Sequence, residues 1–330
     1  MISAGTVLLA RADVQALLSP QACIAAMEDA FRALAEGRVP APAILAMHAH
    51  DGSFHGKAGL LTTDRPYFAA KVNANFPQNG ARFGLPTIQG AVLLFDAADG
   101  RLLAVMDSMA VTALRTAGAT AVAAKHLSRA SSQTLLLCGC GAQALEQLRA
   151  LLCVRSLSRI CAYDLDPGKT DAFAAAAEKA VGVSVASVKD LAKAAMESDV
   201  VVTCTTAKRF FIAPEMVRPG TFIAAVGADH EDKQEISPEL MARAKVVTDV
   251  TDQAARIGDL HHAIAARRMR AADVHAELGE VVAGRKAGRE RDDEIFVFDS
   301  TGTGLQDVAA AIAAYRNAEE KKQGFRYAFG

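Results

Sequence analysis

The chain of 330 residues lacks several features that would assign it to whole classes of protein. It has no apolar run of about 18 residues, so we expect no membrane-spanning helix. Its formal net charge is −1, which gives no field for attracting nucleic acid or a membrane surface. The N-terminus has no basic stretch followed by an apolar one, so we expect no signal peptide. Internal repeats and low-complexity segments are also missing.

Cysteine is scarce, and the six that occur fall mostly in apolar segments. This is typical of reduced, buried thiols in a cytoplasmic protein. Cys138 and Cys140 are one residue apart, but two thiols are too few ligands for a metal site. Three histidines lie close together, but their spacing is not that of a usual zinc site and no carboxylate or thiol completes the ligand set: His48, His50 and His55. We therefore expect no bound metal.

The stretch from Thr134 to Asp166 carries the strongest pattern in the chain. A short apolar run, Thr134–Cys138, leads into Gly-Cys-Gly-Ala-Gln-Ala at 139–144, which matches G-x-G-x-x-G/A with alanine in the third place. Leucines at helical spacing follow, and then a second short strand, Arg159–Tyr163. Strand, glycine turn, helix and strand in this order predict a dinucleotide-binding unit.

Each part of this pattern has a physical reason. Gly139 permits a tight turn, Gly141 lets a pyrophosphate approach the backbone, and Ala144 is small enough for helix–sheet packing. The helix start then offers N–H groups and a positive dipole end to the phosphates. Asp164 follows the second strand, where a carboxylate binds the ribose hydroxyls and repels a 2′-phosphate, so we expect NAD rather than NADP. The alternative is a glycine turn that binds no nucleotide.

Before this stretch the pattern predicts a smaller domain. A helix over Ser19–Gly37 is capped by Ser19 and has Pro20 in its first turn. Strands bounded by turn residues are expected to form a mixed or antiparallel sheet: 53–61, 67–73, 87–95 and 102–107. An alanine-rich helix, Thr112–Leu127, should lead into the second domain.

After residue 134, strands and helices alternate, which predicts a parallel sheet covered on both faces. The expected strands are 134–138, 159–163, 183–186, 199–204, 221–226, 245–249 and 294–298. The expected helices are 142–153, 167–180, 188–196, 238–243, 252–265 and 271–278. Residues 279–293 read as an exposed loop, and residues 304–322 as a last helix that returns to the first domain, with a tail from 319. The chain is thus predicted to be an α/β protein: a Rossmann-like doubly wound parallel sheet (116–303) plus a smaller α+β substrate and dimerisation domain (1–115, with 304–330 returning to it).

Three charged residues lie in or after apolar segments, and each has two interpretations. Lys71 is either a ligand-binding lysine or an exposed strand lysine, and Arg115 either faces a site or lies on a helix surface. Asp229 follows an apolar strand, and ligands bind at the carboxyl ends of strands in an open parallel sheet. The alternative interpretation is that Asp229 is a loop residue that caps the next segment.

Seven motifs together resemble the ornithine cyclodeaminase/mu-crystallin family over roughly residues 20–315. They are KVNANFP (71–77), GLPTIQG (84–90), LLAVMD (102–107), TALRTAG (112–118), GCGAQ (139–143), AVGAD (225–229) and AELGEV (276–281). The family includes ornithine cyclodeaminases, alanine dehydrogenases and ketimine or cyclic-imine reductases. The resemblance implies a homodimer that binds a small amino- or imino-acid substrate and a nicotinamide dinucleotide.

The resemblance also implies residue roles. Lys71 and Arg115 would bind the substrate carboxylate, with Thr87 contributing a hydroxyl, and Lys71 and Asp229 are the catalytic candidates, Asp229 beside the substrate nitrogen. The implied cofactor positions are Thr116, Gly139, Gly141, Ala142, Gln143, Asp164, Thr205, Val226 and Ser300.

Two departures from the family pattern bear on the substrate. Family members commonly carry an arginine after an early proline pair, but here Pro40 and Pro42 precede Ala43 and Ile44. Ornithine cyclodeaminases use a glutamate in the next strand, near where this chain has Lys57, which we expect to be a substrate ligand. The leading hypothesis is therefore an NAD-dependent oxidoreductase acting on imines and amino acids, such as a ketimine or cyclic-imine carboxylate reductase or an alanine dehydrogenase. The alternatives are an ammonia lyase of the ornithine cyclodeaminase type that recycles NAD, and a non-catalytic NAD(P)-dependent binder of small ligands.

Overall fold

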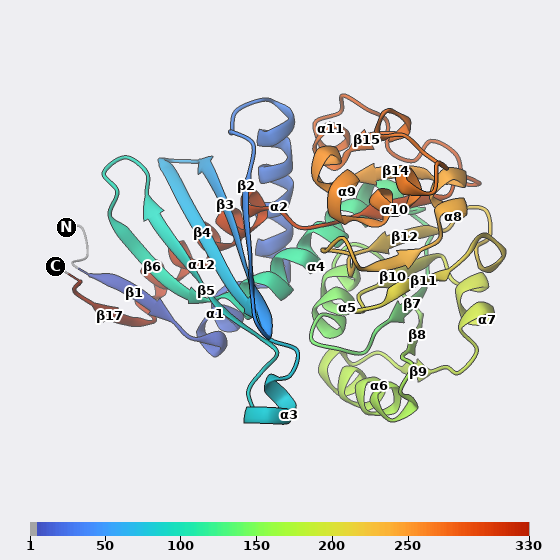
Figure 1. The fold of residues 1–330 in the computed structure, drawn as a ribbon, viewed down its shortest axis with the longest axis horizontal. Coiled ribbons are helices and arrows are strands. Elements are labelled where there is room, and N and C mark those ends of the chain that lie inside the picture. The colour runs from blue at the N-terminus through green and yellow to red at the C-terminus, as the bar shows by residue number, and fades with distance from the viewer. Residues whose placement is uncertain (1–4, 330) are drawn as a thin grey trace. The chain divides into compact units, whose positions relative to one another are not determined.

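The computed structural model describes residues 5–329 and divides the chain into two compact units (Figure 1). Unit 1 contains residues 1–118 and 303–330, and unit 2 contains residues 119–302. The chain passes from unit 1 to unit 2 within the helix α4 (Ser108–Leu127). The boundaries expected from the sequence, 115/116 and 303/304, lie within three residues of these divisions. The functional assignment of each unit remains a prediction.

Unit 1 is built on a seven-stranded mixed sheet. Its strands lie in the order β17 (Phe325–Tyr327), β1 (Thr6–Leu9), β6 (Leu102–Asp107), β5 (Ile88–Asp96), β4 (Pro66–Asn75), β3 (Gly52–Thr62) and β2 (Ala43–Ala49). Only β1 and β6 are parallel, and the other neighbours are antiparallel. The mixed sheet expected from the turn signals is therefore confirmed, and β1, β2 and β17 are additions to it.

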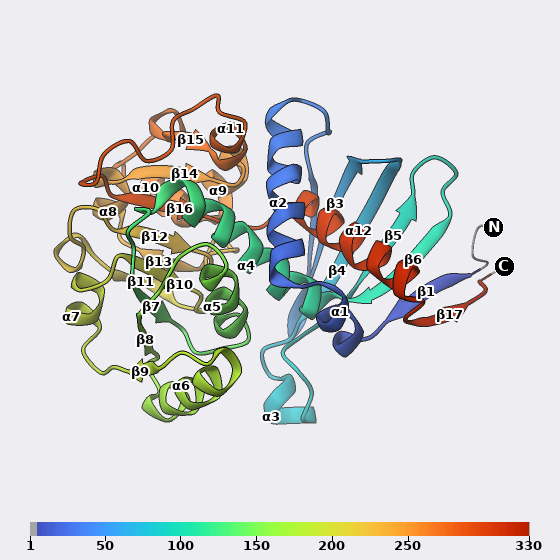
Figure 2. The ribbon, with the colours of Figure 1, turned by 180° about the vertical axis from the view of Figure 1, so that it is seen from behind.

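Two long helices pack together in unit 1, and one of them lies against the sheet (Figure 2). The helix α2 (Pro20–Ala35) begins as expected, since the Ser19 side chain accepts a hydrogen bond from the amide of Ala22 and Pro20 occupies the first turn. The final helix α12 (Gly304–Lys321) packs against β3, β4 and α2. Two shorter helices complete this unit: α1 (Arg11–Leu17) and α3 (Asn79–Phe83).

Unit 2 contains an eight-stranded sheet in which every neighbouring pair is parallel. The order is β15 (Ala276–Glu277), β14 (Lys245–Thr248), β16 (Phe296–Asp299), β12 (Phe222–Ala225), β10 (Val200–Thr203), β7 (Thr134–Cys138), β8 (Arg159–Tyr163) and β9 (Val185–Ser187). The central strands are fully buried and mostly apolar, as expected when helices cover both faces of a parallel sheet. The predicted Rossmann-like α/β class is confirmed.

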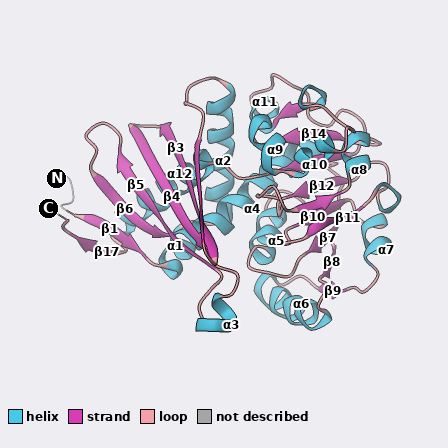
Figure 3. Ribbon diagram, viewed as in Figure 1, coloured by secondary structure: helices cyan, strands magenta, loops and turns pink. Residues whose placement is uncertain are grey.

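The helices of unit 2 alternate with its strands (Figure 3). They are α5 (Ala144–Leu152), α6 (Pro167–Val181), α7 (Leu191–Met196), α8 (Pro238–Arg243), α9 (Thr251–Ile257), α10 (Asp259–Ala265) and α11 (Leu278–Val282). A separate two-stranded ribbon pairs β11 (Lys208–Ile212) with β13 (Gln234–Ile236). No helix in residues 5–329 is long and apolar enough to cross a membrane.

Three local expectations were wrong. The helix expected over 252–265 is two helices, because the chain is extended at Gly258 and each helix ends or begins there. The helix expected over 271–278 is instead a short 3-10 turn (Ala271–Asp273) followed by β15. Part of the loop expected over 279–293 is helix α11. In addition to these three differences, the tail expected from residue 319 contributes β17 to the sheet of unit 1.

Buried acids connect the loops of unit 2. The Asp299 carboxylate accepts hydrogen bonds from the amides of Asp259 and Leu260 at 3.3 and 2.8 Å. Asp259 in turn accepts from the amides of Glu235 and Ile236 at 2.8 and 2.9 Å. Burial raises the pKa of Asp299 to about 7 and also raises the pKa values of Asp259 and Glu235. The folded chain therefore holds protons that the unfolded chain releases at lower pH.

This difference predicts a pH-dependent stability. Between the ordinary pKa of 3.8 and the folded value of about 7, the native state binds more protons than the unfolded state, so stability falls as pH rises. Asp299→Asn removes one titrating group. The amount by which the free energy of unfolding of this variant lies below that of the unmodified chain should therefore shrink by at least ~1 kcal/mol from pH 5 to pH 7.5. Urea unfolding at several pH values measures this difference. A destabilisation that stays constant across the range would contradict the prediction.

Candidate functional site

Lys71 is buried in unit 1, so the interpretation of it as an exposed strand lysine is wrong. It lies in β4 with 4% of its surface exposed. Its Nζ atom is 2.8 Å from Oδ2 and 2.9 Å from Oδ1 of Asp307, and it donates to Oγ1 of Thr112 at 3.2 Å. A buried ammonium requires such partners, because removing it from water is costly.

Arg115 is buried in the same cluster, so it is not a surface arginine. It lies in α4 and is 5% exposed. Its Nε atom donates to Oδ1 of Asp307 at 3.2 Å, and one terminal nitrogen donates to Oε1 of Gln306 at 3.0 Å. Strand β4, helix α4 and helix α12 thus bring one lysine, one arginine and one aspartate together. The pairing of Lys71 with Arg115 in one site was expected, but Asp307 was not.

The burial and charge of this cluster perturb the pKa of Lys71. That pKa is lowered to about 7, chiefly by burial and also by the charges of Arg115 and Lys57, while Asp307 opposes the shift. Burial also acts on Asp307, but the neighbouring cations outweigh it and keep the pKa of Asp307 below its ordinary value. Lys71 therefore changes charge close to neutral pH, a property common among catalytic lysines.

The other expected ligands in unit 1 lie in different surroundings. Lys57 is the cross-strand neighbour of Lys71, so both side chains point to the same face of the sheet. Thr87 is exposed and lies just before β5, five positions from Val92, the residue opposite Lys71. The structure does not place it in the cluster. Thr116 is buried, and its hydroxyl donates to the carbonyl of Thr112 within α4 at 2.7 Å.

In unit 2, the expected cofactor residues gather at one edge of the sheet. The five adjacent strands β16, β12, β10, β7 and β8 are parallel, so their carboxyl ends meet there. Each is followed by an expected residue: Ser300, Val226, Thr205, Gly139 and Asp164, in that order. This is the edge at which open parallel sheets bind ligands.

The glycine turn has the geometry that the motif implies. Gly139 has φ +99°, a conformation that favours glycine, and a Cβ there would lie 2.9 Å from the carbonyl oxygen of Cys204. Gly141 and Ala142 are exposed, and a Cβ at Gly141 would meet no atom within 4 Å. The helix α5 starts two residues after Ala142. The turn therefore leaves open space over Gly141 for a pyrophosphate.

Asp164, the residue expected to bind the ribose, supports this turn. Its Oδ2 atom accepts a hydrogen bond from the amide of Cys140 at 2.9 Å, and Oδ1 accepts from the amide of Asp166 at 3.1 Å. A carboxylate oxygen can accept more than one hydrogen bond, so these contacts leave acceptor capacity for ribose hydroxyls.

Glu235 is a buried acid that the sequence analysis missed. It accepts hydrogen bonds from the hydroxyl of Thr203 and from the amide and hydroxyl of Thr205, each at 2.7 Å, and from the amide of Gly227 at 2.9 Å. It thereby joins the loops that follow β10 and β12. Because it lies in the polar run EDKQEIS, no apolar periodicity marks it in the sequence.

Two buried polar atoms at expected cofactor positions have no hydrogen-bond partner within residues 5–329. They are Oε1 of Gln143 and Oγ of Ser300. Buried polar atoms are normally paired, so each is available to a ligand. With the open glycine turn and Asp164, these atoms fit a dinucleotide at this edge. Val226 is buried directly after β12 and offers apolar surface.

Asp229 is exposed three residues beyond Val226, on the loop after β12. Its Oδ1 atom is 2.6 Å from Nζ of Lys233, four residues along the chain. An exposed carboxylate paired with a lysine can exchange protons with a ligand, so the catalytic hypothesis for Asp229 stays a prediction. It lies four residues after the end of β12.

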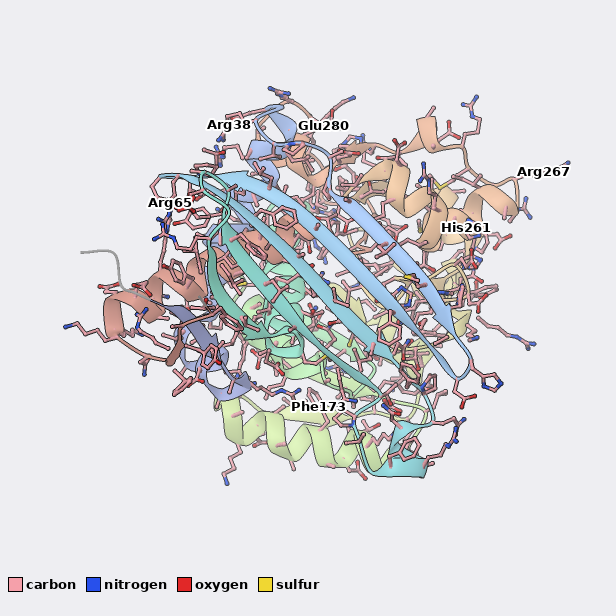
Figure 4. The ribbon with its side chains drawn as sticks, turned by 60° about the vertical axis from the view of Figure 1, so that its left-hand side comes forward. Arg38, Arg65, Phe173, His261, Arg267 and Glu280 are labelled. Carbon is pink, nitrogen blue, oxygen red and sulfur yellow. The ribbon has the colours of Figure 1, made fainter. Side chains whose placement is uncertain are left out.

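A pocket of about 320 Å³ in unit 1 contains none of the expected site residues. Its charged lining includes Arg65, which lies in the turn between β3 and β4 (Figure 4), together with Arg101 and Arg316. Arg65 is 3.0 Å from Asp96, and Arg316 pairs with Asp64. Arg101 pairs with Asp99, so the three arginines have three acidic partners, whereas Lys71 and Arg115 share one. The Lys71 cluster is therefore the better candidate for binding an anionic substrate.

Comparison with known proteins adds to this geometry. The model of the ornithine cyclodeaminase/mu-crystallin family matches residues 4–322. The chain is 37% identical over 324 residues to alanine dehydrogenase of Archaeoglobus fulgidus, covering 98% of each chain.

Two solved structures are similar along their whole length. An archaeal alanine dehydrogenase dimer with bound NAD has a TM-score of 0.93 and 36% identity, over 98% of this chain and 99% of that one. Thermococcus litoralis Δ1-pyrroline-2-carboxylate reductase in complex with NADH and L-proline has a TM-score of 0.92 and 32% identity, over 98% of this chain and 100% of that one. From its motifs, its fold and these likenesses, the chain belongs to the ornithine cyclodeaminase/mu-crystallin family.

Proposed function

We propose that the chain is an NAD-dependent oxidoreductase that reduces the imine of an α-keto acid to an amino acid, or catalyses the reverse oxidation. The observation that carries this proposal is the buried pair of cations, Lys71 and Arg115. Within residues 5–329, Asp307 is the only carboxylate that pairs with either of them. The similar alanine dehydrogenase and pyrroline carboxylate reductase act on substrates of this kind by their names.

The carboxylate of the substrate is the natural ligand of this pair. When Lys71 is protonated, two positive charges face the one negative charge of Asp307, so one bound carboxylate completes the charge balance. Arg115 presents a planar fork that suits a carboxylate, and Lys71 presents a compact charge. Lys57, on the same face of the sheet as Lys71, adds positive charge on that side. A neutral ligand could accept hydrogen bonds here but would leave the charges unbalanced.

NAD is the proposed cofactor, and it supplies a hydride in its reduced form. The two similar structures contain NAD and NADH according to their descriptions. In this chain, the glycine turn would hold the pyrophosphate and Asp164 the ribose, where its charge disfavours a 2′-phosphate. Gln143, Thr205 and Ser300 would line the same cofactor.

The proton needed at the substrate nitrogen is assigned to Asp229. A positioned carboxyl group that transfers a proton contributes about 10²- to 10⁴-fold to a rate. Lys71 and Arg115 hold the acid end of the substrate, so the orientation of the imine carbon is set by groups that do not themselves react. Orientation of this kind supplies much of the rate in two-substrate reactions.

A direct assay tests this function. The purified chain should oxidise NADH when given Δ1-pyrroline-2-carboxylate, or pyruvate with ammonium, and Asp229→Asn should lower kcat by about 10²-fold or more. Loss of absorbance at the NADH band measures both. Full turnover by Asp229→Asn would refute the proton role. Ammonia release from ornithine without net NADH change would support the lyase alternative, and tight binding without turnover the non-catalytic one.

Cofactor preference can be tested at Asp164. Asp164→Asn removes the charge but keeps an acceptor for the amide of Cys140, so the glycine turn is retained. The ratio of kcat/KM for NADH over NADPH should fall by about tenfold or more, equivalent to about 1.4 kcal/mol of lost repulsion. Steady-state kinetics with both cofactors give this ratio, and an unchanged ratio would contradict the proposed ribose contact.

We also propose a homodimer, formed through the outer face of the sheet in unit 1. Alternation along β2, β3 and β4 places four apolar side chains on the face opposite Lys71: Leu45, Met47, Phe54 and Val72. All four are exposed, with Leu45 and Met47 each at 60%. A contiguous apolar face of this kind favours burial against a second surface.

The six cysteines are free thiols, which supports a cytoplasmic location.

The dimer makes a simple prediction. The double variant Leu45→Glu, Met47→Glu places two charges on this face, so the particle mass should fall from that of two chains to that of one. Light scattering coupled to size-exclusion chromatography measures the mass. Met196→Glu, at an exposed apolar residue of α7 in unit 2, is the control and should leave the mass unchanged. A double variant that keeps the mass of two chains would refute this interface.

A further inference from the structure

The buried cluster of unit 1 contains an acid to which neither the sequence patterns nor the proposed reaction gives a role. Asp307 lies in the first turn of α12 and is 1% exposed. It is separated by 236 residues from Lys71 and by 192 from Arg115, yet it contacts both. One carboxylate thus joins side chains from β4 and α4.

The start of α12 is held firmly, which fixes Asp307 in place. The hydroxyl of Thr303 caps the helix. A Cβ at Gly304 would clash with the backbone of Ala58, and a Cβ at Gly59 would lie 2.7 Å from Gly304. Both glycines therefore allow α12 to begin directly against β3. A carboxylate in the first helical turn is also favoured by the helix dipole.

We propose that Asp307 is a positioning residue of this site: it holds Lys71 and Arg115 together in a buried cluster that is short of one anion, and the carboxylate of the substrate is that anion. This inference rests on the proposed function. Its geometric basis is that Oδ1 of Asp307 accepts hydrogen bonds from both Lys71 and Arg115. The other oxygen, Oδ2, lies within ion-pair distance of Lys71 at 2.8 Å but accepts no hydrogen bond within residues 5–329. Gln306, the preceding residue, holds the far end of Arg115 at 3.0 Å.

Three charged groups on neighbouring elements act on Lys71. Helix α12 contributes Asp307, helix α4 contributes Arg115, and strand β3 contributes Lys57. On β5 the cross-strand neighbour is Val92, which is uncharged. Asp307 is the one negative group among them, so it is the group that favours the charged form of Lys71. Removing the charge of Asp307 should lower the pKa of Lys71, so Lys71 should lose its proton at a lower pH.

A simple structural ion pair is the competing explanation, since buried pairs often only offset the cost of their own burial. Such a pair affects stability, whereas a positioning residue also affects how Lys71 titrates and how the cluster accepts a carboxylate. The two explanations therefore differ in the pH dependence of substrate binding, which stability alone does not alter.

The test compares Asp307→Asn and Asp307→Glu with the unmodified full-length chain. For an imine carboxylate, kcat/KM should fall as pH rises through the region in which Lys71 loses its proton. This falling part of the pH profile is called the limb below. In Asp307→Asn this limb should move to lower pH by about one unit or more, with kcat/KM at pH 8 reduced at least about tenfold. Asp307→Glu keeps the charge but displaces it, so the limb should return to its original pH while KM stays raised.

Asp96→Asn is the matched control, because Asp96 is a buried aspartate of unit 1 that faces two arginines, Arg65 and Arg101, away from the cluster. It should lower the melting temperature and leave the limb in place. Calorimetry at pH 6 and pH 8 can measure the binding of L-proline and L-alanine in the presence of NAD. This readout does not need turnover.

The outcomes separate this inference from the proposed function. If Asp307→Asn turns over and its limb lies at the original pH, the inference alone is overturned. The same holds if its KM is lower and its limb lies at the original pH, because Asp307 would then merely compete with the substrate. Carboxylate binding that depends on Asp307 without any turnover would overturn the reaction and support the inference. Absence of carboxylate binding by the unmodified chain would overturn both. If Asp307→Asn does not fold, wild-type kcat and KM in Asp307→Glu would overturn the inference.

Discussion

Two buried cations with one buried carboxylate between them impose the strongest constraint on unit 1. An uncompensated charge in a protein interior is costly, so Lys71 and Arg115 require Asp307 close by. Asp307 lies near the end of the chain, and the cations lie in its first half. The last helix must therefore return to the first sheet, and Gly59 and Gly304 provide the space for it to do so.

In unit 2 the corresponding constraint is parallel pairing. When neighbouring strands run in the same direction, the loops that follow them are brought to one edge, whatever their distance in sequence. Glu235 then joins two of these loops through four hydrogen bonds, and Asp259 and Asp299 extend the buried acidic connections behind it. The loops that follow β10 and β12 are thus tied together by side chains, while the glycine turn is held by Asp164.

Strand alternation explains why Lys57 shares a face of the sheet in unit 1 with Lys71, whereas Thr87 does not. Lys57 and Lys71 are cross-strand neighbours, so alternation places both on the face that α12 covers. Thr87 precedes β5 at an odd number of positions from Val92 and is exposed, so the same alternation does not direct it toward the cluster. Proximity of motifs in the sequence did not predict this, because the face of each residue depends on strand register.

The sequence by itself determined the elements whose signals are local: the strand, glycine turn and helix at 134–152, the capped start of α2, and the apolar strands of the parallel sheet. These follow from apolar periodicity and from backbone preferences of glycine, proline and serine. Only the tertiary structure decided that the helix expected over 252–265 breaks at Gly258, that Glu235 joins two loops, and that Asp307 completes the Lys71 cluster. The physical reason is that a polar residue carries no periodic signal, and its role is set by which distant groups must share its burial.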